Sequence, residues 1–529
     1  QALRVQYQSD SDFPTIHVIL TTLLSQAMAN SAFVVGICLF SALGALLFGL
    51  DIGYIAPILE DAYFKRDVAH LPDWNQPESE IDGYTAGKIV SAFSLGCICT
   101  SFPLVSGYLL DSWGRRSTII LGSLVCILGF GFQASSSSVW QMICGRFVTG
   151  AAIGVFSCAV PLYQSEVAPA ELRGALTTLY ELLLTFGIFV AALVDYTFLG
   201  VEGGWQRILW VMMVPAAVLL AGGFFLPRSP RWLVQQDRHE EASQVLRSLR
   251  SEAEAVSELE EIVLSQRSAA ALGEVRWSEL LGGRAFQLLA VGMAVQVLQQ
   301  LQGINFITFY GPRIFKELGL NVEVFMSLSN FVLFIATVPG IYLVEKAGRR
   351  ILLIASAVGM LVPDLVMGLF GSLSKGGPNA VDLSSNTAAV AVVSMIFLFT
   401  VNFAYGWGPL SWVYCAEIFP LRIRSRSVGM TTMANWVGTL LVAQFTPMLF
   451  ARIGLSVFYL LALFSAAALS LALWLPETKG VPLERIDKIF DAKFSNDDSP
   501  VEVLPLSVSE DSTDKKKYGA LGDSMFNKL

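Results

Sequence analysis

The sequence contains few charged residues and very few histidines. Only 15% of its 529 residues are charged, against roughly a quarter in an average soluble protein, so the chain cannot hide its apolar surface in water. The three histidines, His17, His70 and His239, lie outside the hydrophobic runs, and we predict no metal site. No phosphate-binding loop or nucleophile triad is present, which argues against an ATP-driven pump and against an enzyme.

Cysteine usage and basic residues exclude two further classes. The seven cysteines are an odd number and all fall in hydrophobic runs, so we expect small core residues and not a disulfide framework. Apart from 515–517, no block of basic residues occurs in this chain of net charge −8, which argues against nucleic acid as a partner. No cleavable signal peptide is evident, and no cofactor is expected.

Long hydrophobic runs are abundant. Hydrophobic residues make up 54% of the chain, and runs of about 20 residues, the length of a helix that crosses a bilayer core of ~30 Å, recur throughout. We therefore predict an all-α polytopic membrane protein with twelve spans, embedded in the lipid bilayer. The predicted spans are 33–58, 86–109, 117–136, 138–162, 174–198, 206–226, 285–311, 323–344, 350–371, 388–416, 427–449 and 453–475.

An even number of spans places both termini on one side, and the arginine-rich short loops on that side predict that it is cytosolic. The plasma membrane is the default location. The predicted domains are a cytosolic arm at 1–32, an N-terminal six-helix bundle at 33–226, a cytosolic helical linker at 227–284, a C-terminal six-helix bundle at 285–475 and a cytosolic tail at 476–529.

Charged patterns of the first half recur in the second half. Asp111-x-x-Gly-Arg-Arg returns as Glu345-x-x-Gly-Arg-Arg 234 residues later. Tyr163-x-x-Glu-x-x-Pro-x-x-x-Arg returns from Tyr414, 251 residues later, and the proline-rich end of span six returns 249 residues later, from Pro476. Similar offsets of independent patterns indicate a duplication.

We interpret the recurring acids and bases as a cytosolic latch that closes when the halves rock together. Each solvated ion pair contributes only about 1 kcal/mol, but several together bias a two-state equilibrium. A topology signal is the alternative for any single cluster. The latch residues are Asp111, Arg115, Arg116, Glu166, Arg173, Glu345, Arg349, Arg350, Glu417, Arg424 and Glu477.

Two of the charges inside predicted spans, Asp51 and Arg146, are the strongest candidates for energy coupling. Asp51 and Arg146 are each about eight residues from the outer ends of spans one and four, which places them at the same depth. A lone ionised carboxylate there costs several kcal/mol, so Asp51 has to pair with Arg146 or bind a proton. We predict that Asp51 carries a proton, with Arg146 as its partner, and that the proton is the coupling ion. The alternative is a permanent structural ion pair.

Amides in span seven predict a site for a polyhydroxylated cargo. Sugar hydroxyls both donate and accept, and their C–H faces pack on aromatic planes. Gln299, Gln300 and Asn305 provide amides at mid-membrane depth, and Trp412 provides an aromatic plane after Gly408-Pro, a pair that loosens span ten. Interhelical hydrogen bonding is the alternative for the amides, and ordinary packing for Trp412.

These motifs, with Gly145-Arg146 in span four and Asn435-Trp436 in span eleven, resemble the sugar porter family of the major facilitator superfamily. The resemblance covers about residues 35–485. It implies two six-helix bundles around a central cavity, in which Trp412 stacks under the sugar and Gly408 and Asn435 belong to the site. It also implies a gate formed by Phe48, Phe309 and Tyr310.

The sequence departs from that family at informative positions. Glu181 stands where many members have Gln, so it accepts two sugar hydroxyls, carries a second proton, or favours a polyol or another cargo. Leu333 stands where an Asn commonly faces the cavity, and Asn330 is a candidate substitute because it lies one turn earlier. Arg228 replaces a family Glu, which predicts a weaker latch in the first half.

We expect alternating-access transport of a hexose in symport with a proton. The proton is assigned to the first half and the sugar amides to the second. A facilitative uniporter, a polyol or inositol symporter and a non-transporting sugar sensor on the same fold stay open as alternatives.

Overall fold

The computed structural model of the chain describes residues 32–76, 79–271, 277–280, 282–373, 386–481 and 489–490. The chain divides into two units, Gln1–Asp487 and Lys488–Leu529. In the second unit only 489–490 are described, within a short helical segment. The helices and contacts below all belong to the first unit.

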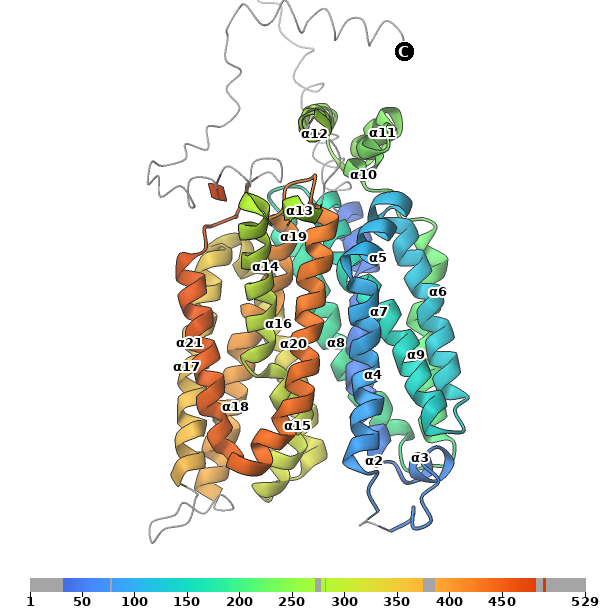
Figure 1. The fold of residues 1–529 in the computed structure, drawn as a ribbon, viewed down its shortest axis with the longest axis vertical. Helices are drawn as coiled ribbons and strands as arrows, with labels where there is room; N and C mark the ends of the chain where they lie inside the picture. The colour runs from blue at the N-terminus through green and yellow to red at the C-terminus, as the bar shows by residue number, and fades with distance from the viewer. Residues whose placement is uncertain are drawn as a thin grey trace, which may run out of the picture. The chain divides into compact units, whose positions relative to one another are not determined.

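Every regular element among the described residues is a helix, and the helices form two sets on either side of a seam (Figure 1). The first set contains the span Ala32–Glu60 with α2 (Leu43–Glu60), α4 (Gly83–Ser101) followed by α5 (Pro103–Tyr108), α6 (Arg115–Ala134), α7 (Val139–Val167), α8 (Arg173–Phe198) and α9 (Gly204–Gly223). The second set contains α14 (Gly283–Leu301) followed by α15 (Ile304–Glu317), α16 (Val322–Ala347), α17 (Arg349–Leu373), α18 (Asn386–Tyr405) followed by α19 (Trp407–Glu417), α20 (Arg424–Ile453) and α21 (Phe458–Trp474).

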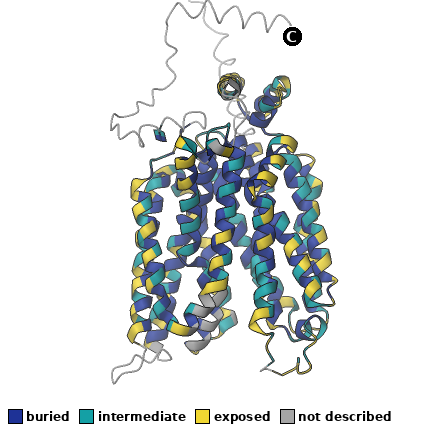
Figure 2. Cartoon of the chain, in the orientation of Figure 1, coloured by how far each residue is buried: buried dark blue, intermediate teal, exposed yellow. Residues whose placement is uncertain are grey.

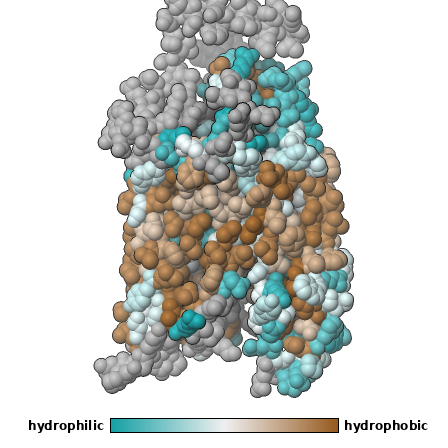
Figure 3. Space-filling model, in the orientation of Figure 1, coloured by the Kyte–Doolittle hydropathy of each residue, from teal (hydrophilic) through white to brown (hydrophobic). Residues whose placement is uncertain are grey.

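Each predicted span coincides with one of these helices or with a broken pair. In the described part, nine helices are long and apolar enough to cross a membrane, or ten with the bent pair that starts with α4. The pair α14–α15 and the helix α20 account for the other two predicted spans. Brown hydrophobic side chains cover the middle of the face seen in Figure 3, and the dark buried residues in Figure 2 concentrate on the inner faces. The predicted membrane fold is confirmed.

Short helices occupy the two ends of the bundles. One end, called here the α10 end, carries α10 (Pro230–Gln235), α11 (His239–Leu249), α12 (Glu252–Ala271) and α13 (Trp277–Leu280). The opposite end, called the α3 end, carries α3 (Ala62–Asp67). At the α3 end, partial burial acts to raise the pKa of Asp67, but hydrogen bonds from Arg66 and Trp205 lower it below the usual value.

Three spans are broken, and of these only the tenth was expected to be loosened, at Gly408-Pro. The second span bends by 50° between α4 and the segment from Pro103, because proline cannot continue the hydrogen-bond ladder. The seventh span breaks at Gly303, whose φ of +116° is open mainly to glycine. The tenth span breaks at Gly406, with φ −120° and ψ −98°. The last two breaks expose backbone next to the predicted amides and Trp412.

Glycines bring α4 and α7 into backbone contact. A Cβ on Gly96 would lie 2.1 Å from the carbonyl oxygen of Phe147, and one on Gly150 would lie 2.0 Å from that of Phe93. Small residues at such interfaces let transmembrane helices pack closely in the absence of a hydrophobic driving force. This contact also fixes Phe93, which reaches the functional site.

We predict that Gly96→Ala lowers the melting temperature of the detergent-purified protein, because the methyl group must push α4 and α7 apart at a cost of about 1–3 kcal/mol. Gly87→Ala on the same helix is the control, since its Cβ would have no neighbour within 4 Å. Thermal unfolding followed by intrinsic fluorescence measures both. Equal melting temperatures for the two variants would contradict the packing described.

Candidate functional site

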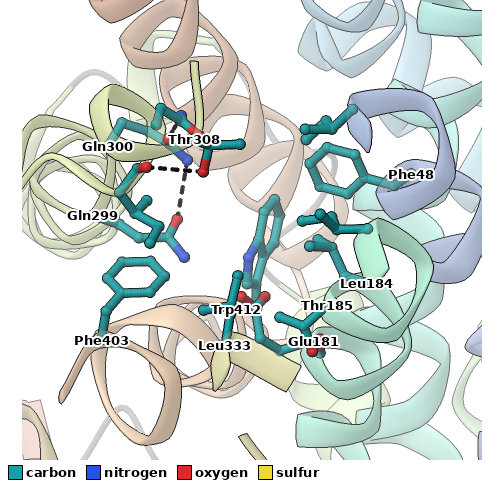
Figure 4. A pocket seen from close by; sticks show the side chains of 14 residues that line it. Phe48, Glu181, Leu184, Thr185, Gln299, Gln300, Thr308, Leu333, Phe403 and Trp412 are labelled. Carbon is teal, nitrogen blue, oxygen red and sulfur yellow. Dashed lines mark hydrogen bonds between the residues drawn. The ribbon is translucent and has the colours of Figure 1, made fainter. Parts of the chain in front are cut away.

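A cavity of about 50 Å³ lies between the two helix sets. This is several times the 10–15 Å³ that one water molecule needs, so it is an internal space and not a packing defect. In Figure 4, Gln299 and Gln300 lie on one side, Phe48, Leu184 and Thr185 on the other, and Trp412 between them. The lining residues are Phe48, Ile52, Glu181, Leu184, Thr185, Ile188, Gln299, Gln300, Ile304, Asn305, Thr308, Leu333, Phe403 and Trp412.

The amides of α14 and α20 form one hydrogen-bonded cluster. Asn435 Nδ2 donates to the Oε1 atoms of Gln296 and Gln299, both at 2.6 Å. Gln300 Nε2 donates to Asn435 Oδ1 at 2.9 Å. Asn435 is fully buried and does not line the cavity, so it acts on the cavity through Gln299 and Gln300. These amides form hydrogen bonds between helices, which was the alternative to sugar binding. Gln299 and Gln300 also line the cavity, so the two roles do not exclude each other.

The first turn of α19 provides this cluster with a backbone acceptor. Gln299 Nε2 donates to the carbonyl oxygen of Gly408 at 2.8 Å, and Asn305 Nδ2 donates to Gln300 Oε1. Gly408 is confined as well, since a Cβ there would lie 3.0 Å from the Phe403 ring and 3.1 Å from Glu181 Oε1. The broken span thus places its first turn against both the amides and the acid.

Trp412 joins the two bundles across the cavity. Its ring centroid lies 5.2 Å from that of Tyr180 on α8, at an interplanar angle of 50°, and its side chain faces the cavity. The Tyr180 hydroxyl donates to Ser157 Oγ at 3.2 Å, which holds the ring in place. An aromatic plane is thereby held on the cavity wall, where the apolar face of a sugar ring packs well.

Glu181 is the one ionisable side chain among the described residues that line the cavity. It is only 5% exposed, and its buried Oε2 has no hydrogen-bond partner among the described residues. A buried, unpaired carboxylate costs several kcal/mol, whereas the helix terminus formed by α19 beside it offsets only about 0.3–1 kcal/mol. The first bundle therefore contributes an acid to a cavity whose polar groups were expected mainly from the second.

Asp51 and Arg146 meet, outside the cavity lining. Arg146 Nη1 donates to Asp51 Oδ2 at 2.5 Å, and both side chains are almost completely buried. Tyr54 completes the site: its hydroxyl lies 3.1 Å from Asp51 Oδ1 and accepts from Arg146 at 3.0 Å. The equal depth that the sequence predicted brings the two charges into direct contact; their role in proton transfer stays a prediction.

Tyr54 and Gln133 were missed by reasoning from the sequence. The Tyr54 hydroxyl is within hydrogen-bond distance of both Asp51 Oδ1 and Gln133 Oε1, at 3.1 and 2.7 Å. One hydroxyl proton serves one acceptor at a time, so the state of Asp51 decides where Tyr54 donates. The available signal was the spacing of three residues between Asp51 and Tyr54, which shares a helix face.

A chain of aromatic contacts runs from Arg146 to the cavity. The Arg146 guanidinium lies 4.7 Å from the centroid of the Phe93 ring. Phe93 makes a T-shaped contact with Trp436 at 5.5 Å, and Trp436 contacts Phe48 at 4.9 Å. Phe48, a predicted gate residue, lines the cavity. Trp436 belongs to α20, so the chain of contacts crosses from the first bundle to the second.

The remaining gate and cavity predictions have mixed outcomes. The side chains of Phe309 and Tyr310 lie outside the described part of the structure, so their gate role stays a prediction. On α16, Leu333 lines the cavity and Asn330 does not. The suggestion that Asn330 replaces the missing amide is therefore wrong for this conformation, because the helix turns Leu333 inward.

The first-half latch residues gather at the α10 end. Arg115 Nη2 donates to Glu166 Oε1 at 2.8 Å, and Asp111 Oδ1 lies 4.0 Å from Arg115 Nη1. The second oxygen of Glu166 accepts from Ser229 Oγ at 2.6 Å. Arg116 instead donates to the carbonyl oxygen of Phe224.

The second-half latch repeats this arrangement with one more carboxylate. Arg349 donates to Glu417 Oε1 at 2.9 Å and to Glu345 Oε2 at 3.1 Å, and Thr478 Oγ1 donates to Glu417 Oε2 at 2.7 Å. Glu477 was expected to act as an acid facing the paired arginines. Its two oxygens instead accept from the backbone N–H groups of Arg349 and Arg350, at 2.8 and 3.0 Å, which caps the start of α17.

Arg228 lies where the first half would carry the equivalent acid. Its guanidinium is 3.6 Å from Glu241 on α11, and α6 begins after Gly114 without a side-chain cap. The ring of Trp232 occupies the space beside Gly114, 2.8 Å from where a Cβ would lie. The first half thus lacks the carboxylate cap that Glu477 gives the second half; the weaker first-half latch stays a prediction.

Contacts between the bundles at this end involve other latch residues. Glu345 Oε1 accepts from the backbone N–H of Ala175 at 2.9 Å, at the start of α8. Arg173 Nη1 donates to the carbonyl oxygen of Val481 at 3.1 Å. Arg424 Nε donates within the second half, to the carbonyl oxygen of Phe419 at 3.0 Å. The α10 end is therefore closed by hydrogen bonds between the halves, next to ion pairs inside each half.

Fold, cavity and buried charges together define a two-bundle membrane carrier of the major facilitator type. A model of the sugar (and other) transporter family matches residues 37–490. The chain is 35% identical to the galactose-proton symporter of Escherichia coli, covering 88% of this chain and 96% of that one. It is 31% identical to an MFS glucose transporter of Aspergillus flavus, covering 86% and 89%. The chain belongs to the sugar transporter family.

Solved structures match the same fold. The proton:xylose symporter XylE bound to 6-bromo-6-deoxy-D-glucose superimposes with a TM-score of 0.75 at 25% identity, covering 87% of this chain and 99% of that one. XylE from Escherichia coli in an inward open conformation superimposes with a TM-score of 0.64 at 24% identity, covering 86% and 99%. The arrangement of helices is therefore closer to the first of these two structures.

We predict that Glu345→Ala loosens the α10 end, because it removes the acceptor of the Ala175 N–H and a partner of Arg349. Losing about 1 kcal/mol shifts the ratio of closed to open molecules roughly fivefold. Distances between spin labels at Glu171 and Lys479, both exposed, report the shift. Glu240→Ala removes the same charge from an exposed site on α11; a distance distribution that matches this control would contradict the prediction.

Proposed function

We propose that this protein transports a hexose by alternating access, in symport with a proton. The cavity between the bundles supports this proposal most directly, since it combines an aromatic plane with amides whose atoms bond across helices. Membership of the sugar transporter family and the names of the relatives, a galactose-proton symporter among them, favour a monosaccharide as cargo.

The sugar binds when the amide cluster exchanges partners. Gln299 and Gln300 bond to each other, to Gly408 and to Asn435 in this closed state. A sugar hydroxyl that inserts among them replaces one amide bond with two, because each hydroxyl donates and accepts. Trp412 packs on the apolar face of the ring. Since the cluster joins α14, α20 and the start of α19, sugar binding rearranges the broken span.

The proton binds to Asp51. Protonation removes the charge that Arg146 faces and frees the Tyr54 hydroxyl, which then donates to Gln133. Arg146 keeps its contact with the Phe93 ring, which touches Trp436 of the second bundle. Moving the guanidinium therefore acts directly on the face of α20 beside Asn435. This route supports coupling; a facilitative uniporter with a permanent Asp51–Arg146 pair is the rival mechanism.

The same proposal places the α10 end, and with it the latch, on the cytosolic side of the plasma membrane. The arginines of the short loops at this end support that orientation through the positive-inside rule. The hydrogen bonds between the halves at this end hold the cytosolic side closed in the conformation described, and the cargo would enter from the α3 end.

We predict that Asp51→Asn abolishes uphill, proton-driven sugar uptake while sugar exchange at equal concentrations continues. The neutral amide mimics a permanently protonated acid, so the variant rocks with sugar but cannot release the proton. Uptake of labelled glucose, galactose, fructose, xylose and inositol into proteoliposomes, with pH recorded inside, measures both activities and identifies the cargo.

Asp364→Asn is the matched control. Asp364 is also a fully buried intramembrane acid, but it accepts from Ser465 at 2.8 Å, within the second bundle, and does not line the cavity. We expect its uptake to remain proton-driven. Uphill uptake that persists in Asp51→Asn would reject Asp51 as the proton carrier, and sugar flux without proton movement in the unaltered protein would favour the uniporter.

A further inference from the structure

Glu181 has no role in the ion pair, the amide cluster or the latch. It faces the cavity beside Trp412 (Figure 4), while Asp51 and Arg146 bond to each other outside the cavity lining. The cavity is thus lined by a titratable group that is separate from Asp51. This inference rests on the proposed sugar transport: the protonation state of Glu181 decides which hydrogen-bonding groups the site offers to the cargo.

Among the described residues that line the cavity, no cation compensates a charge on Glu181. The elements around the cavity present apolar or neutral side chains: α2 presents Phe48, α14 and α15 present amides and a threonine, α16 presents Leu333, and α18 and α19 present aromatic rings. On α8 itself the neighbouring titratable group is Tyr180, whose hydroxyl bonds to Ser157. Nothing described around the cavity therefore favours the ionised acid, apart from the helix terminus of α19.

The first turn of α19 favours an anion only weakly. Oε1 of Glu181 lies close to Gly408, 3.1 Å from the position of a Cβ there, but it accepts no hydrogen bond from the Gly408 N–H among the described contacts. Helix-terminus effects are small compared with the cost of an isolated buried carboxylate. Geometry therefore favours the neutral acid in the closed cavity.

We propose that Glu181 binds the sugar as a neutral carboxylic acid, with a proton of its own in addition to the one on Asp51. The neutral acid offers an O–H donor and a carbonyl acceptor, and a glutamine side chain likewise combines N–H donors with a carbonyl acceptor. The neutral acid therefore forms hydrogen bonds with a sugar hydroxyl without leaving a charge in the cavity. When the pH rises and Glu181 ionises, the donor is lost and closing the cavity buries a charge. Sugar affinity then falls with rising pH.

The test separates Glu181 from Asp51 by measuring sugar binding in an Asp51→Asn background. Titrations of D-glucose and D-galactose, followed by intrinsic tryptophan fluorescence and calorimetry, are run from pH 5.5 to pH 9.5. A single proton required for binding weakens affinity by up to tenfold per pH unit once the acid ionises. We expect Asp51→Asn to keep this alkaline loss, and the double variant with Glu181→Gln to bind with an affinity that does not change with pH.

Two further variants guard against a folding artefact. Glu181→Asp keeps a titratable acid and should retain the alkaline loss. Asp195→Asn removes another buried acid on α8, whose two oxygens have no partner among the described residues and which does not line the cavity; its pH dependence should match that of the unaltered protein.

Different results overturn different statements. A pH-independent affinity in Asp51→Asn, or an alkaline loss that survives in the double variant, overturns the role of Glu181. Tighter binding of glucosamine than glucose that disappears in Glu181→Gln overturns it too, because it would show an ionised acid pairing with an ammonium group. Uptake that is not proton-linked, together with an alkaline loss that depends on Glu181, rejects the proposed coupling and keeps this inference.

Discussion

Polar groups inside a bilayer must find partners within the protein, and this constraint organises the whole molecule. It makes every described element a helix, and it confines buried charges and amides to places where helices from different parts of the chain meet. Asp51 finds Arg146 and Tyr54, and Asn435 finds glutamines of α14. Gln299 in turn donates to the carbonyl oxygen of Gly408 in the first turn of α19. Glu181 and Asp195 are exceptions among the described acids, and of the two only Glu181 lines the cavity, where an unpaired acid is a functional signal.

Coupling between a proton and a sugar requires that two separate sites bias one two-state element. The seam between the bundles is a suitable element, since both sites contact it. Arg146 reaches it through Phe93 and Trp436, and the amide cluster reaches it through Asn435, the neighbour of Trp436 on α20. A displacement of α20 is therefore felt at both sites, although the ion pair and the cavity share no residue. These contacts identify a route by which the two sites can influence each other. The coupling free energy itself is measured by the Asp51 variants.

The sequence predicted contacts best for residue types that have few physical reasons to lie inside a membrane. An intramembrane Asp and Arg at equal depth have to meet, and their contact followed from counting residues along two spans. Breaks in the spans were harder to predict, because Gly303 and Gly406 differ from other glycines only in the dihedral angles that packing imposes. Tyr54 was missed because a tyrosine in a hydrophobic run is most often core. Asn330 was misjudged because helix rotation, which sequence spacing alone does not fix, turned Leu333 into the cavity.

The duplicated latch shows how a repeat becomes unequal. Both halves keep an arginine that bonds to a glutamate of the Tyr-x-x-Glu motif, with a hydroxyl on the other oxygen of that glutamate. In the second half, the carboxylate of Glu477 caps the start of α17. The first half has Arg228 at the corresponding place, and Arg228 lies near Glu241 on α11. The start of α6 thus packs against the Trp232 ring, whereas the start of α17 is capped by the Glu477 carboxylate. Salt weakens a charge-assisted cap but not apolar packing, so the two halves should respond differently to ionic strength. At high salt, opening of the α10 end should begin in the second half, where the Glu477 cap is weakened.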